Sequence, residues 1–131
     1  MRGERSLTYT TDLSAVRALV REQARSAGLA GPRAIDLELA VSEVAANTVR
    51  HAAAQGHHEG TVRVWCTADE IVCEVRDGGV IADVLAGRRQ PPPGALSGHG
   101  LWLVHQVCDL VEIASGTDGT TVRMRMALRR S

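Results

Sequence analysis

Two glycines one residue apart, Gly98 and Gly100, stand immediately before an apolar run with helical spacing. The N-terminus of a helix offers unpaired N–H groups and a partial positive charge, so glycines there let an anion come close to the backbone. Phosphate is the usual anion at such a turn. The motif alone is equally compatible with a plain turn, and its interpretation therefore depends on the rest of the chain.

A carboxylate and a carboxamide, Glu43 and Asn47, lie four residues apart in the segment IDLELAVSEVAANTVRHAAA. The spacing of its apolar residues predicts one long helix that begins near Pro32, so the two polar side chains share one side of it. A charged carboxylate on a covered helix needs a partner or a chemical task. The alternative is an exposed edge with two ordinary polar residues.

The same predicted helix carries apolar residues on two opposite sides. We expect other elements to cover both sides, so that the helix is largely buried. One side holds Ile35, Leu39 and Ala46, and the other holds Leu37, Val41 and Val44.

Two further candidate positions lie where predicted strands end or begin. One strand runs straight into Asp77, and the glycines at 78 and 79 allow a sharp turn and the close approach of a ligand. Thr120 follows Gly119 at the start of the last predicted strand. Each position also has the composition of a common turn.

The remaining pattern predicts the elements around these candidates. An extended start at 6–10 precedes a helix that Asp12 can cap and Gly28 can end. The segments 62–67 and 71–76 alternate as a strand hairpin, and 111–115 with 120–128 form a closing hairpin around a turn at 116–119. Between the hairpins, about 80–97 is rich in glycine, arginine and proline, which favours a loop that can act as a lid. Arg88 and Arg89 in this loop could reach phosphate or simply face solvent.

Composition limits the classes of function. The 131 residues suit one domain over 1–131, and 15 basic against 15 acidic residues argue against a general affinity for nucleic acid or anionic membranes. The N-terminus lacks a signal-peptide core and no stretch reaches the roughly 20 apolar residues of a membrane span, so we expect a soluble cytoplasmic protein. The three cysteines lie singly in apolar runs, which favours buried thiols over disulfides or a zinc site.

Four motifs in this order and spacing resemble the nucleotide-binding pattern of the GHKL or Bergerat-fold ATPases, the superfamily of gyrase B and the histidine kinases. They are Glu43-x-x-x-Asn47, Asp77-x-Gly79, Gly98-x-Gly100 and Gly119-Thr120. SEVAANTVRHA and GHGLWLVHQVCD look like the N-box and second glycine box of the stand-alone bacterial anti-sigma factors that are also serine protein kinases. The resemblance covers nearly the whole chain. It implies an α+β fold, a two-layer sandwich whose mixed, mainly antiparallel sheet is covered on one face by helices.

The resemblance also implies ATP and Mg²⁺ as the groups bound. Asn47 would supply its amide oxygen to the metal, and Glu43 would act as the base for a substrate serine or for water. Gly98 and Gly100, with Leu101 beside them, would present backbone N–H groups to the phosphates.

At the other end of the implied site, Asp77 would accept a hydrogen bond from the adenine amino group. Gly79 would leave room for the base, and Thr120 would complete the adenine end of the pocket.

The function implied is that of an ATP-binding anti-sigma factor, which phosphorylates a serine of an anti-sigma-factor antagonist and regulates transcription by partner switching. Its partners would be a sigma factor, the antagonist and a second copy in a homodimer, with no direct contact to nucleic acid or membrane. The alternative is a docking module of the same fold that binds these partners without phosphoryl transfer. A dinucleotide-binding dehydrogenase is disfavoured, because its glycine motif should follow a first strand directly.

Overall fold

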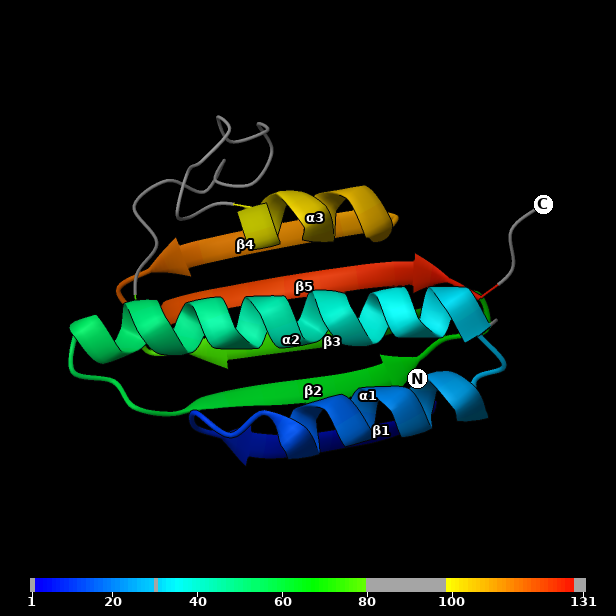
Figure 1. Cartoon of the computed structure of the whole chain (residues 1–131), viewed down its shortest axis with the longest axis horizontal. Coiled ribbons are helices and arrows are strands. Elements are labelled where there is room, and N and C mark those ends of the chain that lie inside the picture. The colour runs from blue at the N-terminus through cyan, green and yellow to red at the C-terminus, as the bar shows by residue number, and fades with distance from the viewer. Residues whose placement is uncertain (1, 30, 80–98, 129–131) are drawn as a thin grey trace.

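Five strands and three helices make up the residues that the computed structural model describes, 2–29, 31–79 and 99–128. Figure 1 shows the helices side by side on one face of a single sheet. In chain order the elements are β1 (Arg2–Tyr9), α1 (Ser14–Ser26), α2 (Gly31–Ala54), β2 (Gly60–Cys66), β3 (Glu70–Asp77), α3 (His99–Val107), β4 (Leu110–Gly116) and β5 (Gly119–Ala127).

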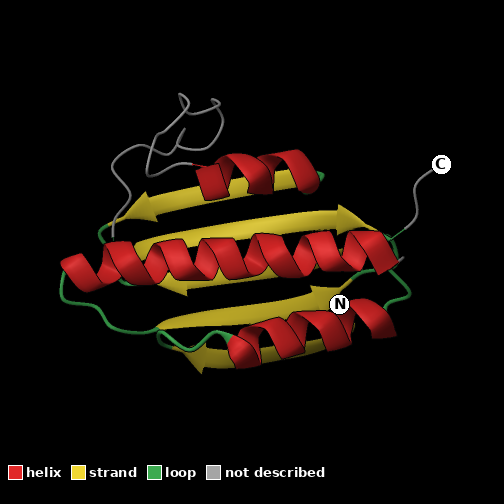
Figure 2. Ribbon diagram, in the orientation of Figure 1, coloured by secondary structure: helices red, strands yellow, loops and turns green. Residues whose placement is uncertain are grey.

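The strands form one sheet in the order β1-β2-β3-β5-β4. Each neighbouring pair among the described strands is antiparallel, where we expected a mixed sheet that is mainly antiparallel. The helices cover one face, which gives the two layers seen in Figure 2. The predicted α+β sandwich is therefore confirmed.

The apolar residues of the strands alternate as predicted and point toward the helices. On β2 and β3 these are Val62, Val64, Ile71, Cys73 and Val75, which are fully buried. Val122, Met124 and Met126 continue the layer on β5. A core without phenylalanine is thus built from aliphatic side chains packed between sheet and helices.

Helix α1 begins and ends close to the predicted signals. The Asp12 carboxylate accepts the Ser14 N–H at 3.0 Å, one residue before the N-cap Leu13. At the other end, Gly28 N–H donates to the Arg25 carbonyl and Leu29 N–H to the Ala24 carbonyl. This pair of bonds is the Schellman motif, with Gly28 just past the last helical residue.

Helix α2 runs from Gly31 to Ala54, as predicted, but it is covered on one side only. Leu37, Val41 and Val44 are fully buried against the sheet, whereas Ile35 is 66% exposed and Leu39 is 52% exposed. The expectation of two covered faces was wrong. The helices form a single layer on the sheet, and within the described residues no element lies over the outer side of α2.

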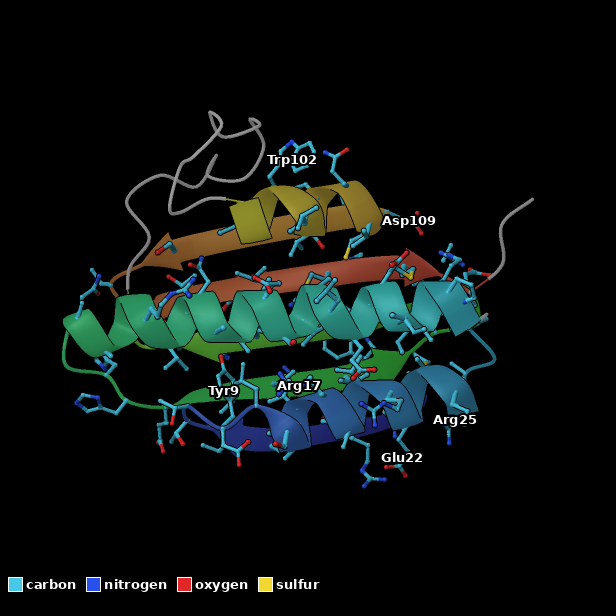
Figure 3. All side chains as sticks on the ribbon, viewed as in Figure 1. Tyr9, Arg17, Glu22, Arg25, Trp102 and Asp109 are labelled. Carbon is cyan, nitrogen blue, oxygen red and sulfur yellow. The ribbon has the colours of Figure 1, made fainter. Side chains whose placement is uncertain are left out.

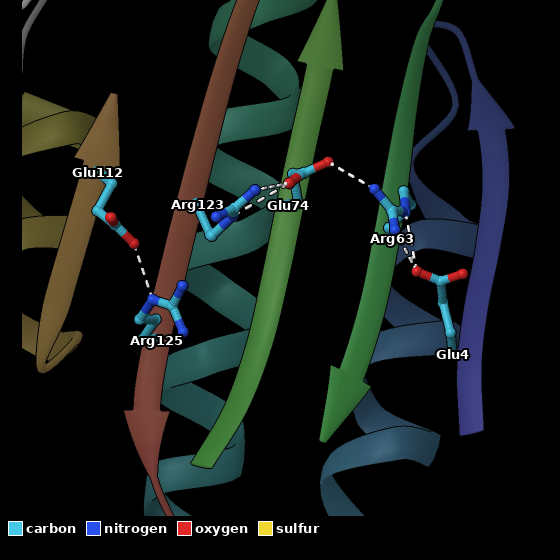
Figure 4. A network of polar contacts seen from close by, with 6 residues as sticks. All are labelled: Glu4, Arg63, Glu74, Glu112, Arg123 and Arg125. Atoms are coloured by element: carbon cyan, nitrogen blue, oxygen red, sulfur yellow. Dashed lines mark hydrogen bonds and ion pairs between the residues drawn. The ribbon is translucent and has the colours of Figure 1, made fainter. Parts of the chain in front are cut away.

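The sheet face that points away from the helices carries charged side chains from all five described strands (Figure 4). The Glu74 side chain is only 3% exposed, and Arg63 and Arg123 donate hydrogen bonds to its two carboxylate oxygens. Arg63 also pairs with Glu4. Both guanidinium groups lie over the Trp65 ring, 5.2 and 5.6 Å from its centre. Long neighbouring side chains thus bury a carboxylate on a face that alternation alone would leave exposed.

Two of the three cysteines are buried in the core, as expected. Burial raises the pKa of the Cys73 thiol well above its ordinary value and that of Cys108 to about 12. Cys66, at the end of β2, is half-buried. Across the described segments, no helix combines the length and the apolar character of a membrane span.

Candidate functional site

One cross-strand row at the end of the sheet brings the predicted adenine-binding residues together. Because every pairing is antiparallel and in register here, Tyr9, Gly60, Asp77, Thr120 and Ser115 lie opposite one another on successive strands. All five stand on the helix-facing side of the sheet, since strand neighbours in one row share a face. Asp77 and Thr120, which are 43 positions apart in sequence, are direct partners in this row.

A chain of hydrogen bonds holds the middle of the row. The Gly79 N–H donates to Asp77 Oδ1 at 2.6 Å, and the Thr120 hydroxyl donates to the Gly79 carbonyl at 2.8 Å. Ser115 Oγ lies 2.7 Å from Thr120 Oγ1. The turn that follows β3 is therefore fixed from both its N–H and its carbonyl group.

Gly119 allows the start of β5 to come this close to the end of β3. Its φ is +108°, and a Cβ at this position would lie 2.2 Å from the Asp77 carbonyl oxygen. A side chain would therefore push the two strands apart. Glycine is therefore required at position 119 because any side chain there would collide with the backbone of Asp77.

Tyr9 closes the other end of the row and connects the sheet to α2. Its ring packs against Gly60, where a Cβ would lie 2.6 Å from the ring, and its hydroxyl lies 2.8 Å from Thr48 Oγ1. Thr48 donates its own proton to the Ala45 carbonyl, so the Tyr9 hydroxyl is the donor of the pair. Figure 3 shows Tyr9 reaching from β1 toward α2. Burial raises the pKa of Tyr9 to about 12, and the nearby negative charge of Asp77 adds to this rise.

Glu43 and Asn47 lie on the flank of α2 that faces α3. They belong to a series at helical spacing that begins with Arg33 and Asp36. Arg33 contacts Asp109 in the turn between α3 and β4, and Asp36 contributes to the raised pKa of Cys108. Both predicted site side chains are half-buried, so they do not lie on a fully exposed edge of the helix.

The amide oxygen of Asn47 already receives a hydrogen bond. Arg50, one turn further along α2, donates from Nη2 to Asn47 Oδ1 at 3.2 Å. The atom that we expect to bind a metal ion therefore faces a cation. An oxygen in this position attracts positive charge, which is the property that a Mg²⁺ ligand needs.

The structure brings most of the predicted residues to one end of the molecule. In Figure 1 the C-terminal half of α2, the end of β3, the start of β5 and the start of α3 lie at this end. Gly100 and Leu101 belong to the first turn of α3. Gly98, the expected lid at 80–97, and Arg88 and Arg89 lie outside the described residues.

A cleft of about 630 Å³ lies at the opposite end of the sheet. Its lining includes Gly28 after α1, Cys66 at the end of β2 and Asp69 in the β2–β3 turn. None of the predicted site residues contributes to it. The size of a cleft does not identify the site in this molecule, because the converging polar groups lie in the Asp77–Thr120 row at the other end of the sheet.

The fold is a two-layer α/β sandwich in which helices cover one face of an antiparallel sheet. Residues 7–126 match the family model described as the histidine kinase-like ATPase domain, and the chain therefore belongs to this family. The match confirms the resemblance to GHKL ATPases that the four motifs carried. No curated protein matches the sequence.

Solved structures share this fold at low sequence identity. A chain of the SiaB-SiaC complex from Pseudomonas aeruginosa aligns with a TM-score of 0.59 and 12% identity, over 92% of this chain and 89% of that one. The histidine kinase domain of the blue-light activated histidine kinase EL346 from Erythrobacter litoralis aligns with the same TM-score and 21% identity, over 92% of this chain and 64% of that one. The present chain thus spans less than two thirds of that histidine kinase chain.

Sequence reasoning missed three residues that hold the site. Tyr9 and Thr48 form a hydrogen bond across 39 positions, and no local sequence pattern predicts such a contact. Ser115 was detectable in part, because a two-residue turn between Gly116 and Gly119 places Ser115 opposite Thr120. The predicted turn covers all four residues 116–119, and a four-residue turn does not define this pairing of Ser115 with Thr120.

Proposed function

We propose that this protein binds ATP and Mg²⁺ at the Asp77–Asn47 end of the sheet and transfers the γ-phosphoryl group to a serine of a protein partner. The partner would be an anti-sigma-factor antagonist, and the protein would also bind a sigma factor. Phosphorylated antagonist would no longer hold the kinase, which would then sequester the sigma factor. Membership of the histidine kinase-like ATPase family supports the ATP-binding part of this proposal.

The base end of the site has the chemistry that adenine requires. The Asp77 carboxylate accepts hydrogen bonds only, which suits the amino group of adenine. Gly79 adds no side chain beside it, and its peptide is held by Asp77 and Thr120. Asp77, Gly79 and Thr120 would thus hold the base.

The phosphate end lies along the flank of α2 and the start of α3. The amide oxygen of Asn47 would hold Mg²⁺, which prefers oxygen ligands and usually takes few of them from the protein. Bound there, the metal would neutralise charge on the phosphates. Gly100 in the first turn of α3, with Gly98 and Leu101 beside it, would offer backbone N–H groups to the same phosphates.

Glu43 is the residue that we assign to proton transfer. It lies one turn before Asn47 on the same flank, so a base and a metal ligand face the same side of α2. Its carboxylate would take the proton of the attacking serine hydroxyl, and ADP would leave with the electrons of the broken phosphorus–oxygen bond. The observation that carries the proposal is that Glu43 and Asn47 share one flank of α2, at the same end of the molecule as the Asp77–Thr120 row.

One of the structural neighbours supports the proposal that the partner is a protein. One of the solved structures that share the fold is a complex, that of SiaB with SiaC. The assignment of a sigma factor and an antagonist as the partners rests on the sequence resemblance. The same is true of the proposed homodimer and cytoplasmic location.

The test combines ATP binding with phosphoryl transfer. Purified protein is incubated with labelled ATP, Mg²⁺ and candidate antagonist proteins, and ATP affinity is measured by calorimetry. Glu43→Ala should bind ATP nearly as well as wild type but lose transfer by about a hundred- to ten-thousand-fold, because a base acts in the transition state. Asn47→Ala should weaken both binding and transfer.

Glu22→Ala is the matched control, since Glu22 is an exposed helical glutamate on α1. It should leave both measurements unchanged. Equal transfer by wild type and Glu43→Ala would overturn the catalytic assignment. If neither protein transfers phosphate while both bind the partners, the docking module without catalysis is the correct function.

A further inference from the structure

We propose that Ser115 is a positioning residue for base recognition: through Thr120 it fixes a one-way chain of hydrogen bonds that favours a 6-amino purine over a 6-oxo purine. The inference rests on the proposed function, because it assumes that the Asp77 end of the site holds the base. It assigns a role to a residue on β4 that lies outside the four motifs.

The geometry of the chain is contained in one row of the sheet. Ser115 and Thr120 are direct partners across the β4–β5 hairpin, and Thr120 and Asp77 are direct partners across β5 and β3. Successive contacts measure 2.7 Å from Ser115 to Thr120, 2.8 Å from Thr120 to the Gly79 carbonyl and 2.6 Å from the Gly79 N–H to Asp77.

The number of protons sets the direction of the chain. The Thr120 hydroxyl has one proton, and it is donated to the Gly79 carbonyl. In the contact between the two hydroxyls, Ser115 must therefore be the donor and Thr120 the acceptor. A hydroxyl that accepts a bond becomes a better donor, so Ser115 strengthens the bond from Thr120 to Gly79.

This direction decides what the site offers a base. With its proton directed to Gly79, Thr120 can only accept from a ligand, and the Asp77 carboxylate can only accept as well. A 6-amino group donates to such atoms, whereas a 6-oxo group brings a further acceptor. Without Ser115, the Thr120 hydroxyl is held less strongly and can turn to donate to a 6-oxo group.

The experiment compares ATP with inosine triphosphate, which carries a 6-oxo group, by calorimetry on the full chain. In Ser115→Ala the preference for ATP, measured as the ratio of the two dissociation constants, should fall about three- to ten-fold. Ser115→Thr keeps the hydroxyl and should restore the ratio. Ser6→Ala makes the same chemical change at an exposed position of β1 and should leave the ratio at the wild-type value.

Each outcome has a separate meaning. If the folded wild type binds neither nucleotide, the proposed function fails. If wild type binds ATP and Ser115→Ala keeps the wild-type ratio, or weakens both nucleotides equally, the inference is overturned and the proposed function stands. Should Ser115→Ala not fold, Ser115→Cys replaces the hydroxyl by a weaker donor of similar size, and a wild-type ratio in that variant overturns the inference as well.

Discussion

Arg50 donates a hydrogen bond to the amide oxygen of Asn47 across one turn of α2, over 3.2 Å. Asn47 Oδ1 is the atom that we propose as the Mg²⁺ ligand, and the guanidinium group is hydrogen-bonded to this same oxygen. The two cations cannot both approach the same lone pairs closely, since like charges repel. Metal binding should therefore displace Arg50 from Asn47.

Removing this competitor should make the metal bind more easily. In Arg50→Ala we expect the Mg²⁺ concentration for half-maximal ATP binding to fall about two- to five-fold, because an exposed contact of this kind contributes less than about 1 kcal/mol. Calorimetric ATP titrations at several Mg²⁺ concentrations measure this half-maximal concentration. Arg25→Ala, an exposed arginine on α1, is the control and should change nothing. A higher Mg²⁺ requirement in Arg50→Ala would contradict the competition.

Asp77 should dominate nucleotide affinity at the base end. Asp77→Asn keeps an oxygen that can accept the Gly79 N–H, so the turn can be retained while the charge is lost. The missing charge-assisted hydrogen bond corresponds to about 1.5–3 kcal/mol, or roughly a ten- to hundred-fold weaker ATP affinity. Asp69→Asn, in the exposed β2–β3 turn at the other end of the sheet, is the matched control. If calorimetry finds equal ATP affinity in wild type and Asp77→Asn, Asp77 does not bind the base.

Tyr9 gives a direct optical test of the row, because it is the only tyrosine in the chain. Its pKa of about 12 in the folded protein compares with 10.0 for an unperturbed phenol. The absorbance of phenolate should therefore rise with a midpoint near pH 12 in the folded protein and near pH 10 in denaturant. A folded protein that titrates near pH 10 would mean that Tyr9 does not occupy its buried place beside Gly60.

The same difference in pKa makes stability depend on pH. A phenol whose pKa is higher in the folded state binds its proton more tightly there, so its contribution is complete below pH 10 and is lost as pH rises toward 12. The amount is about 3 kcal/mol of unfolding free energy. Urea unfolding at several pH values should show this fall in wild type and a smaller one in Tyr9→Phe. Parallel curves for the two proteins would exclude Tyr9 as the source.

Replacing Glu74 should lower the stability of the protein more than replacing Glu112, another carboxylate on the outer sheet face. The Glu74 side chain is 3% exposed and bonded to Arg63 and Arg123, whereas Glu112 is 49% exposed and bonded to Arg125. Glu74→Gln removes the carboxylate that Arg63 and Arg123 share and leaves Arg63 with Glu4 alone, so it should lower the unfolding free energy by about 1–3 kcal/mol. Glu112→Gln should cost less than about 1 kcal/mol. Chemical unfolding of the two variants compares them, and equal losses would show that burial does not matter here.

Local patterns determined the elements and the order of the motifs. The period of apolar residues placed α2 to within a residue of its beginning, and the alternation in β2, β3 and β5 identified their helix-facing sides. The spacing of Glu43 and Asn47 put them on one flank of α2, because helical geometry depends only on sequence separation. These features follow from the backbone of a single element.

The tertiary structure decided which elements meet. A period of two tells which face of a strand is apolar, but the pairing of Asp77 with Thr120 and of Tyr9 with Gly60 depends on register between distant strands. The same holds for the cover on α2: its residues at 35 and 39 are apolar, yet they are exposed because the helices form one layer. The sequence by itself therefore determined the chemical groups of the site. Packing between distant segments determined their distances, which set what those groups can bind.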